Sequence, residues 1–168
     1  MIRLAFLLML MASGAAAQAP AELAGADLRR AGADDVRFWG FNLYKAELWT
    51  AGDFAFDAPF ALTLNYKRSF TAEELAVASV KEMARISGRP VEDYSELSSE
   101  LEGCFADVEE GDRITGLSHS GDRATFYFNG LQSCEIETPR FAEVFFGIWL
   151  GEKARDAGTR ASLLGLSR

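Results

Sequence analysis

The sequence has few of the residues from which metal centres and histidine-dependent catalytic sites are built. It contains one histidine, His119, and two cysteines, Cys104 and Cys134, among 168 residues. A structural zinc site takes about four cysteine or histidine ligands, and a Ser-His-Asp triad needs a histidine beside its nucleophile. His119 falls in an expected turn, where a solvated loop histidine is the simpler interpretation. We therefore expect no metal, no cofactor and no such triad.

Basic residues are also scarce relative to acidic ones. The chain has 17 lysines and arginines against 25 aspartates and glutamates, which gives a net charge of −8. A protein that binds nucleic acid through its phosphates needs a basic stripe, and an anionic membrane surface attracts clustered cations. Neither partner is therefore expected. With 49% hydrophobic residues the composition is that of one ordinary globular domain with a full core.

The first 17 residues carry the features of a secretory signal peptide. Arg3 supplies the positive charge, Leu4–Ala12 is an apolar run, and Ala15–Ala17 offers small residues for cleavage. The run is shorter than the roughly 20 residues that span a bilayer, although an uncleaved anchor is the alternative. We predict a signal peptide over 1–17, an N-terminal segment over 18–33 and one domain over 34–168. The mature protein would be periplasmic or secreted, with no membrane span.

Cys104 and Cys134 form an even pair in a chain expected to enter an oxidising compartment. A disulfide is the natural expectation there, with two separate buried thiols as the alternative. The spacing does not resemble a Cys-x-x-Cys redox motif. A bridge closing this loop would add about 3–4 kcal/mol of stability.

Hydrophobic periodicity and turn signals predict strands, then helices, then strands again. Strands are expected over Val36–Trp49 (with a bulge at Gly40), Phe60–Tyr66, Arg113–Ser118, Ala124–Phe128 and Leu131–Glu137. Helices are expected over Ala72–Ser87, over Val91–Phe105 and from Pro139, with Thr138 as its cap, to an end near Gly151. Gln18–Ala24 reads as a loose N-terminus. Strands and helices are segregated, which predicts an α+β fold with a mostly antiparallel sheet and helices on one face.

Several segments resemble the chalcone isomerase-like family, in its bacterial exported branch. They are Phe41–Trp49, Tyr66–Phe70, Gly111–Leu117, Ala124–Gly130 and Phe141–Leu150, and together they span nearly all of the mature chain. The resemblance implies an open-faced sandwich, in which helices pack on one side of a large antiparallel sheet. It also implies an apolar cleft between the two layers.

The family includes plant enzymes that close a flavanone ring and non-catalytic members that bind fatty acids in the same cleft. The resemblance places the catalytic Arg, Thr, Tyr and Asn of the enzymes near Gly32, Tyr44, Leu75 and Glu82. Arg29, Arg30 and Arg37 are nearby substitutes for the arginine. None of the four residue types is retained. Leu75 cannot form hydrogen bonds, and Glu82 adds negative charge where an anionic substrate would lie. We therefore name no catalytic residue.

Four residues are candidates for ligand binding in the implied cleft. The Tyr44 phenol could donate to a ligand carboxylate or carbonyl, or it could be a core tyrosine bonded to the backbone. Arg37 and Arg68 could pair with a carboxylate, or they could be solvated charges at strand edges. Asn65 is a weaker candidate of the same kind.

The function expected is non-catalytic binding of a small apolar or fatty-acid-like ligand by an exported protein. Two alternatives stay open. One is an intramolecular lyase (isomerase) of chalcone type, and the other is a structural or interaction protein whose core is filled and holds no ligand.

Overall fold

A computed structural model describes residues 18–166, and the signal peptide predicted over 1–17 lies outside the described residues. One six-stranded antiparallel sheet runs through the molecule in the order β1-β2-β3-β4-β5-β6. The strands are β1 (Arg29–Phe38), β2 (Phe41–Thr50), β3 (Phe60–Tyr66), β4 (Arg113–Ser118), β5 (Arg123–Phe128) and β6 (Leu131–Glu137). Each strand therefore pairs with its neighbours in the sequence, and β3 and β4 pair although a helical segment is inserted between them.

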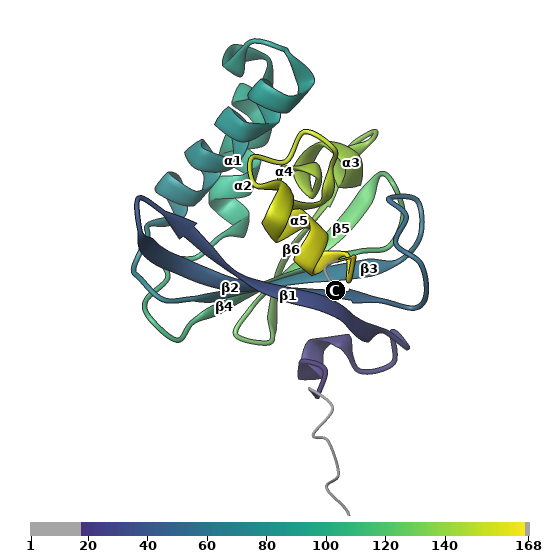
Figure 1. Ribbon diagram of the computed structural model, residues 1–168. Helices are drawn as coiled ribbons and strands as arrows, with labels where there is room; N and C mark the ends of the chain where they lie inside the picture. Colours follow the sequence, from purple (N-terminus) through teal and green to yellow (C-terminus); the bar gives the residue numbers. More distant parts are fainter. Residues whose placement is uncertain (1–17, 167–168) are drawn as a thin grey trace, which may run out of the picture.

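The α-helices gather on one face of the sheet, as Figure 1 shows. They are α1 (Ala72–Ser87), α2 (Ser95–Cys104), α3 (Phe141–Phe145), α4 (Gly147–Leu150) and α5 (Ala157–Leu163). Two short 3₁₀ helices are η1 (Ala21–Leu23) and η2 (Val91–Tyr94). This arrangement confirms the predicted α+β class with helices on one face. Among residues 18–166, no helix is long and apolar enough to cross a membrane.

The predicted long strand Val36–Trp49 is wrong, because the chain reverses within it. Phe38 pairs directly with Phe41, so Trp39 and Gly40 form a two-residue loop between β1 and β2. Both have positive φ, 50° and 80°, as a type I′ turn requires. Gly40 is thus a turn residue and not a bulge. Tryptophan is not typical of type I′ turns, which favour Asn, Asp and Gly. The apolar pattern of the sequence therefore runs through Trp39 without a turn signal.

The N-terminal segment is not loose, because it packs on the face of the sheet that the α-helices leave open. Leu23 of η1 is 3% exposed. The Glu22 carboxylate accepts hydrogen bonds from Arg113 at 3.0 and 2.9 Å and from the Thr115 hydroxyl at 2.7 Å. Burial acts to raise the pKa of Glu22, but these bonds and a backbone hydrogen bond outweigh burial and lower it. An ion pair therefore ties η1 to β4.

Helix α1 begins and ends where its sequence predicts. The Thr71 hydroxyl accepts from the Glu74 backbone N–H at 3.1 Å, and the Glu74 carboxylate accepts from the Thr71 N–H at 2.9 Å. This is the predicted capping box. The helix ends at Gly88, whose φ of 73° is the left-handed conformation of a C-terminal cap. Its core-facing stripe consists of Ala76, Val80, Met83 and Ala84.

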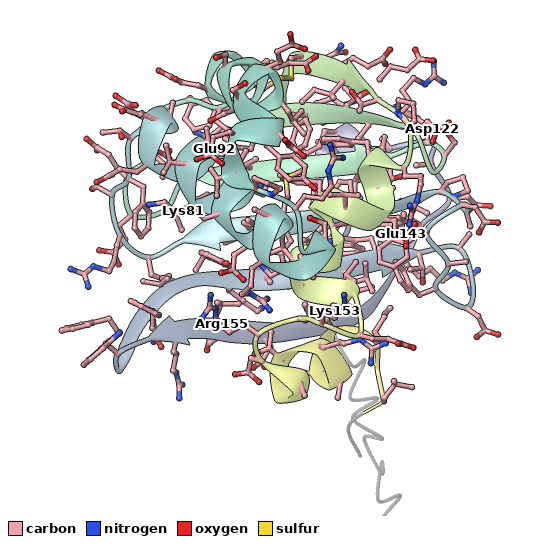
Figure 2. All side chains as sticks on the ribbon, turned by 90° about the horizontal axis from the view of Figure 1, so that it is seen from above. Lys81, Glu92, Asp122, Glu143, Lys153 and Arg155 are labelled. Atoms are coloured by element: carbon pink, nitrogen blue, oxygen red, sulfur yellow. A yellow bond between two sulfur atoms is a disulfide. The ribbon has the colours of Figure 1, made fainter. Side chains whose placement is uncertain are left out.

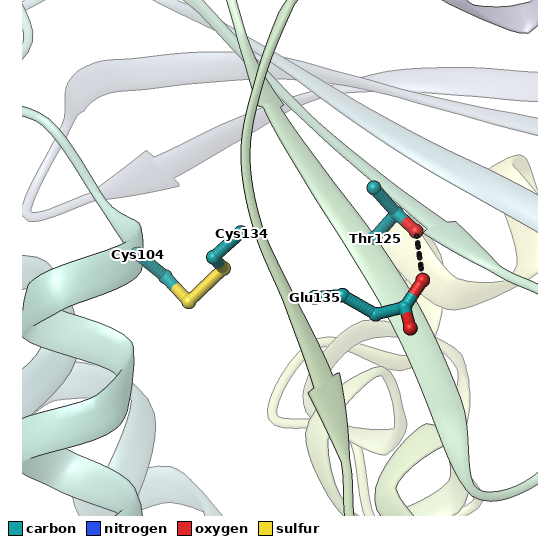
Figure 3. The surroundings of a disulfide bond; sticks show 4 residues. All are labelled: Cys104, Thr125, Cys134 and Glu135. Carbon is teal, nitrogen blue, oxygen red and sulfur yellow. Dashed lines mark hydrogen bonds between the residues drawn. A yellow bond between two sulfur atoms is a disulfide. The ribbon is translucent and has the colours of Figure 1, made fainter.

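The cysteine pair confirms the predicted disulfide. Cys104, the last residue of α2, is bonded to Cys134 of β6, and their Cα atoms are 5.3 Å apart. Figure 3 shows the bridge joining the end of the helix to the strand, with Thr125 of β5 donating to Glu135 at 3.1 Å nearby. The helix expected over Val91–Phe105 is in fact η2 followed by α2.

The helix expected from Pro139 differs from the prediction at its start and in its middle. It begins at Phe141 instead, after Arg140 adopts a left-handed conformation with φ 60°. It is then divided into α3 and α4. The predicted end at Gly151 is confirmed. The phenylalanines of this segment pack against β5, and they close one end of the space between the layers.

Candidate functional site

A cavity of about 190 Å³ lies between the sheet and the helices, over β2 and β3 and under α1. Its walls are mainly apolar, with Leu62 and Leu64 from the sheet and Leu75, Phe145 and Ile148 from the helices. The polar side chains that line it are those of Tyr44, Tyr66, Glu74, Ser79, Glu82 and Trp149. The interlayer space is therefore partly hollow, as the resemblance implied.

The side chains of α1 explain why the space stays open here. Leu75, Ala78, Ser79 and Glu82 line the cavity, and their spacing of three and four residues places them on one face of the helix. Ala78 and Ser79 are too small to reach the sheet. Glu74 and Ala78 are exposed, so the cavity meets solvent along this edge of α1.

Two tyrosines on neighbouring strands lie side by side at the floor of the cavity. Tyr44 of β2 and Tyr66 of β3 are directly paired, and their rings meet edge to face with centroids 5.6 Å apart. The indole N–H of Trp149 donates to the Tyr44 hydroxyl oxygen at 2.9 Å. Burial raises the pKa of Tyr44 to about 12, although the Trp149 bond acts to lower it. Tyr44 is therefore a neutral phenol at neutral pH.

Tyr66 is the more deeply buried of the two phenols. It is 3% exposed, and its hydroxyl makes no hydrogen bond with any residue of the described part of the chain. Burial raises its pKa well above the ordinary value. Because Tyr66 lines the cavity, its hydroxyl is free to donate to a molecule bound there, and a group that accepts its proton would be favoured at this point.

The acidic rim of the cavity is already paired with arginines. The Glu82 carboxylate accepts from the Arg85 Nε at 2.9 Å and from Arg155, which Figure 2 labels. Burial acts to raise the pKa of Glu82, but the hydrogen bonds from Arg155 and Arg85 outweigh burial and lower it. Both guanidiniums are thus held by Glu82 at the rim, and neither lines the cavity.

The structure separates the four predicted binding residues. Tyr44 lines the cavity. Arg37 is exposed and donates through Nε to the Asn42 side-chain oxygen at 2.7 Å, while the Arg68 guanidinium lies 4.8 Å from the centre of the exposed Phe41 ring. Neither arginine lines the cavity. Arg37 lies beside the turn of the β1–β2 hairpin, and Arg68, after β3, packs on a ring of the same hairpin. The placement of Arg37 and Arg68 at the cleft is therefore corrected.

Asn65 also lies away from the cavity. It points to the opposite face of the sheet from Leu64 and Tyr66, as strand alternation requires. Its side-chain amide donates to Glu47 at 3.3 Å. Sequence reasoning missed Tyr66 as a site residue, although Tyr66 shares one side of its strand with Leu62 and Leu64 and could have been found from that pattern.

Comparison with known proteins identifies the family. A family model described as chalcone isomerase-like matches residues 13–165. The chain belongs to the chalcone isomerase-like family. A crystal structure of a fatty-acid binding protein from Arabidopsis thaliana is similar, with a TM-score of 0.66 and 12% sequence identity over 84% of this chain and 88% of that one. At this identity the likeness establishes the shared fold. No curated protein matches the sequence.

Membership of the chalcone isomerase-like family makes four positions informative. Three of the positions that the resemblance assigned to catalytic groups, Tyr44, Leu75 and Glu82, do line the cavity. The fourth, Gly32, packs against the end of α5, where an added Cβ would lie 2.0 Å from the Ser162 carbonyl oxygen. An arginine cannot stand there without moving α5. Three of the four positions that the resemblance singles out therefore lie at the cavity, and they carry other side chains there.

Proposed function

We propose that this chalcone isomerase-like protein is an exported, non-catalytic binding protein for a small apolar ligand. The observation that carries the proposal is the hollow between β2, β3 and α1, whose mainly apolar lining includes Tyr66, a phenol without a hydrogen-bond partner among residues 18–166. Apolar walls with a few polar groups are typical of small-molecule sites. The similar Arabidopsis structure is described as a fatty-acid binding protein, so fatty acids belong among the first ligands to test.

The side chains at the cavity favour binding over catalysis. Leu75 offers no hydrogen bond, and Glu82 is held by two arginines. The two phenols keep their protons because burial raises their pKa values, so neither serves as a base near neutral pH. We expect a hydroxychalcone to keep its enone absorbance when it is incubated with the protein. Loss of that absorbance would favour the isomerase alternative.

Export is the part of the proposal that depends on the sequence before residue 18. Residues 1–17 have the charge, apolar run and small residues of a signal peptide. The Cys104–Cys134 bridge suits an oxidising compartment, where disulfides persist. We infer a periplasmic or secreted protein, and the N-terminal residue of the protein recovered from cells tests this directly.

Ligand binding is tested by mass spectrometry and thermal unfolding. The gently purified protein is denatured and any released small molecule is identified, while the melting temperature is measured with fatty acids of about 8 to 18 carbons and with uncharged apolar compounds. A bound compound should raise the melting temperature by mass action. If no molecule is released and no compound raises the melting temperature, the proposal is contradicted and the ligand-free alternative is favoured.

A pair of variants on α1 localises the binding. Ser79→Phe places a ring in the cavity and should abolish the shift, because Ser79 lines the hollow. Lys81→Phe adds the same ring on the exposed side of the helix and should leave the shift unchanged. Circular dichroism confirms that both variants fold. Equal loss in both would place the binding site elsewhere.

A further inference from the structure

The cavity is lined by hydrogen-bond donors and by carboxylates, but not by a positively charged side chain from the described residues. Tyr66 has no partner in the described part of the chain, and Tyr44 accepts from Trp149 but donates its own proton to no residue described. Two phenol donors thus face the hollow without acceptors. Glu74 and Glu82 are the charged residues that line it, and within residues 18–166 no lysine, arginine or histidine does so. The site offers protons to share but no positive charge.

We propose that the cavity selects an uncharged molecule about the size of one substituted ring, carrying an oxygen that accepts from Tyr66 and Tyr44, in preference to a carboxylate. This refinement rests on the proposed function. An ester, ketone or alcohol has the required acceptor oxygen without a charge.

Desolvation and repulsion both act against a carboxylate here. Taking an unpaired carboxylate out of water is strongly unfavourable, and a nearby cation normally offsets that cost. The guanidiniums of Arg85 and Arg155 at the rim are bound to Glu82. A ligand anion would have to displace Glu82 or lie beside it with like charge. A neutral carbonyl avoids both costs and still accepts from the phenols.

The phenols are arranged to donate. Because the Trp149 N–H occupies one side of the Tyr44 oxygen, the Tyr44 proton is directed elsewhere, and such a chain strengthens the next bond. Tyr66 stands directly opposite on β3, so both donors come from rigid strands. Burial keeps both groups protonated, since it raises the pKa of each. The donors therefore persist throughout the physiological pH range.

The volume of the hollow limits the ligand. About 190 Å³ is available, and an apolar cavity of about 150 Å³ in another protein accommodates benzene. The space therefore suits a single substituted ring or a short chain. A long acyl chain would have to extend past Glu74 and Ala78 into solvent, which forfeits the burial of its tail.

Three probes of similar shape test the proposal: methyl benzoate, benzoate and ethylbenzene, with dissociation constants measured by calorimetry at neutral pH. We expect methyl benzoate to bind at least about tenfold more tightly than benzoate, because benzoate must lose its hydration. Tyr66→Phe should weaken methyl benzoate about 5- to 10-fold and leave ethylbenzene unchanged. Tyr127→Phe is the matched control, since Tyr127 packs on the other face of the sheet.

Glu82→Gln tests the role of the rim. It removes the negative charge and releases Arg85 and Arg155, so benzoate should bind more tightly than in the unchanged protein. The proposal is overturned if benzoate binds as tightly as methyl benzoate, if Tyr66→Phe weakens ethylbenzene equally, or if Glu82→Gln lowers benzoate affinity. If none of the three probes binds but another compound does, the proposed ligand class of one substituted ring is wrong, and the proposed binding function stands. If nothing binds, both fail.

Discussion

The two ends of the space between sheet and helices are built in opposite ways. At the end under α3, aromatic rings fill the space, and each is 4% exposed or less: Phe126, Phe141, Phe145 and Phe146. Phe126, Phe145 and Phe146 also form the wall that separates this end from the cavity, whereas Phe141 does not line it. At the end under α1, the helix presents small side chains above Tyr44 and Tyr66, and a cavity of about 190 Å³ is left. We call the end under α3 the packed half of the sandwich. We call the end under α1, which contains the cavity, the hollow half.

Glycine and cystine reinforce the packed half. A Cβ added to Gly116 would lie 2.9 Å from the Phe146 ring, so the absence of a side chain on β4 lets that ring approach the sheet. The Cys104–Cys134 bridge ties α2 to β6. The hollow half has no such reinforcement in the described residues, and it retains two phenols with protons to donate. The difference teaches that stability can be altered apart from the binding site only at residues such as Phe141, which do not line the cavity.

The largest effect is expected from opening the packed half. Phe141→Ala removes a ring that is 1% exposed and that contacts three other phenylalanine rings. We expect a loss of about 3–5 kcal/mol in the free energy of unfolding, from lost burial plus the cavity left behind. Urea unfolding measures it. A loss below about 1 kcal/mol would show that the packed half is not close-packed as described.

Removing the disulfide should have a slightly smaller effect on the same half. Replacing Cys104 and Cys134 together by serine frees a loop with a sequence separation of 30 residues. We expect a loss of about 3–4 kcal/mol, chiefly because the unfolded chain gains freedom. The double variant compared with the oxidised protein in urea measures the difference. An unchanged unfolding midpoint would contradict this account.

Much of the fold could be predicted because local signals agreed with the final packing. The capping box at Thr71 and Gly88 set α1, and Asn129-Gly130 set the β5–β6 hairpin, with positive φ at both residues. The β1–β2 hairpin could not be predicted, because Trp39 in a left-handed conformation interrupts an otherwise continuous apolar alternation. Strand pairing decides that turn, and pairing is not local.

The site was harder to predict than the fold. Tyr44 could be placed at the cavity from its strand and from the resemblance. The sequence makes Arg37 and Arg68 the cations nearest the expected cleft, but Arg37 bonds to Asn42 beside the β1–β2 turn and Arg68 lies against Phe41. The Glu82–Arg155 pair joins residues 73 positions apart, so no local pattern could reveal it.

A truncation in the hollow half should cost less than one in the packed half. Leu75→Ala removes an apolar side chain that is partly buried and already borders open space. We expect about 1–2 kcal/mol of destabilisation, since fewer contacts are lost than for a fully packed side chain. The same urea titration measures it, and the enlarged cavity should accept a bulkier ligand. A loss equal to that of Phe141→Ala would break the distinction between the halves.

The smallest effect concerns pH at the rim of the hollow half. The pKa of Glu82 is lower in the folded protein, so its ion pairs stabilise the fold at a pH above the ordinary glutamate pKa of about 4.3. That contribution is lost as pH falls through the lowered, folded-state pKa. Because Arg155 is largely exposed, we expect less than about 1 kcal/mol. Glu82→Gln should therefore be less stable than the unchanged protein at neutral pH and equal to it in acid. Glu73→Gln, on the exposed side of α1, is the control, and its free energy of unfolding should be close to that of the unchanged protein at either pH. If Glu82→Gln remains less stable than the unchanged protein in acid, packing and not charge stabilises this rim.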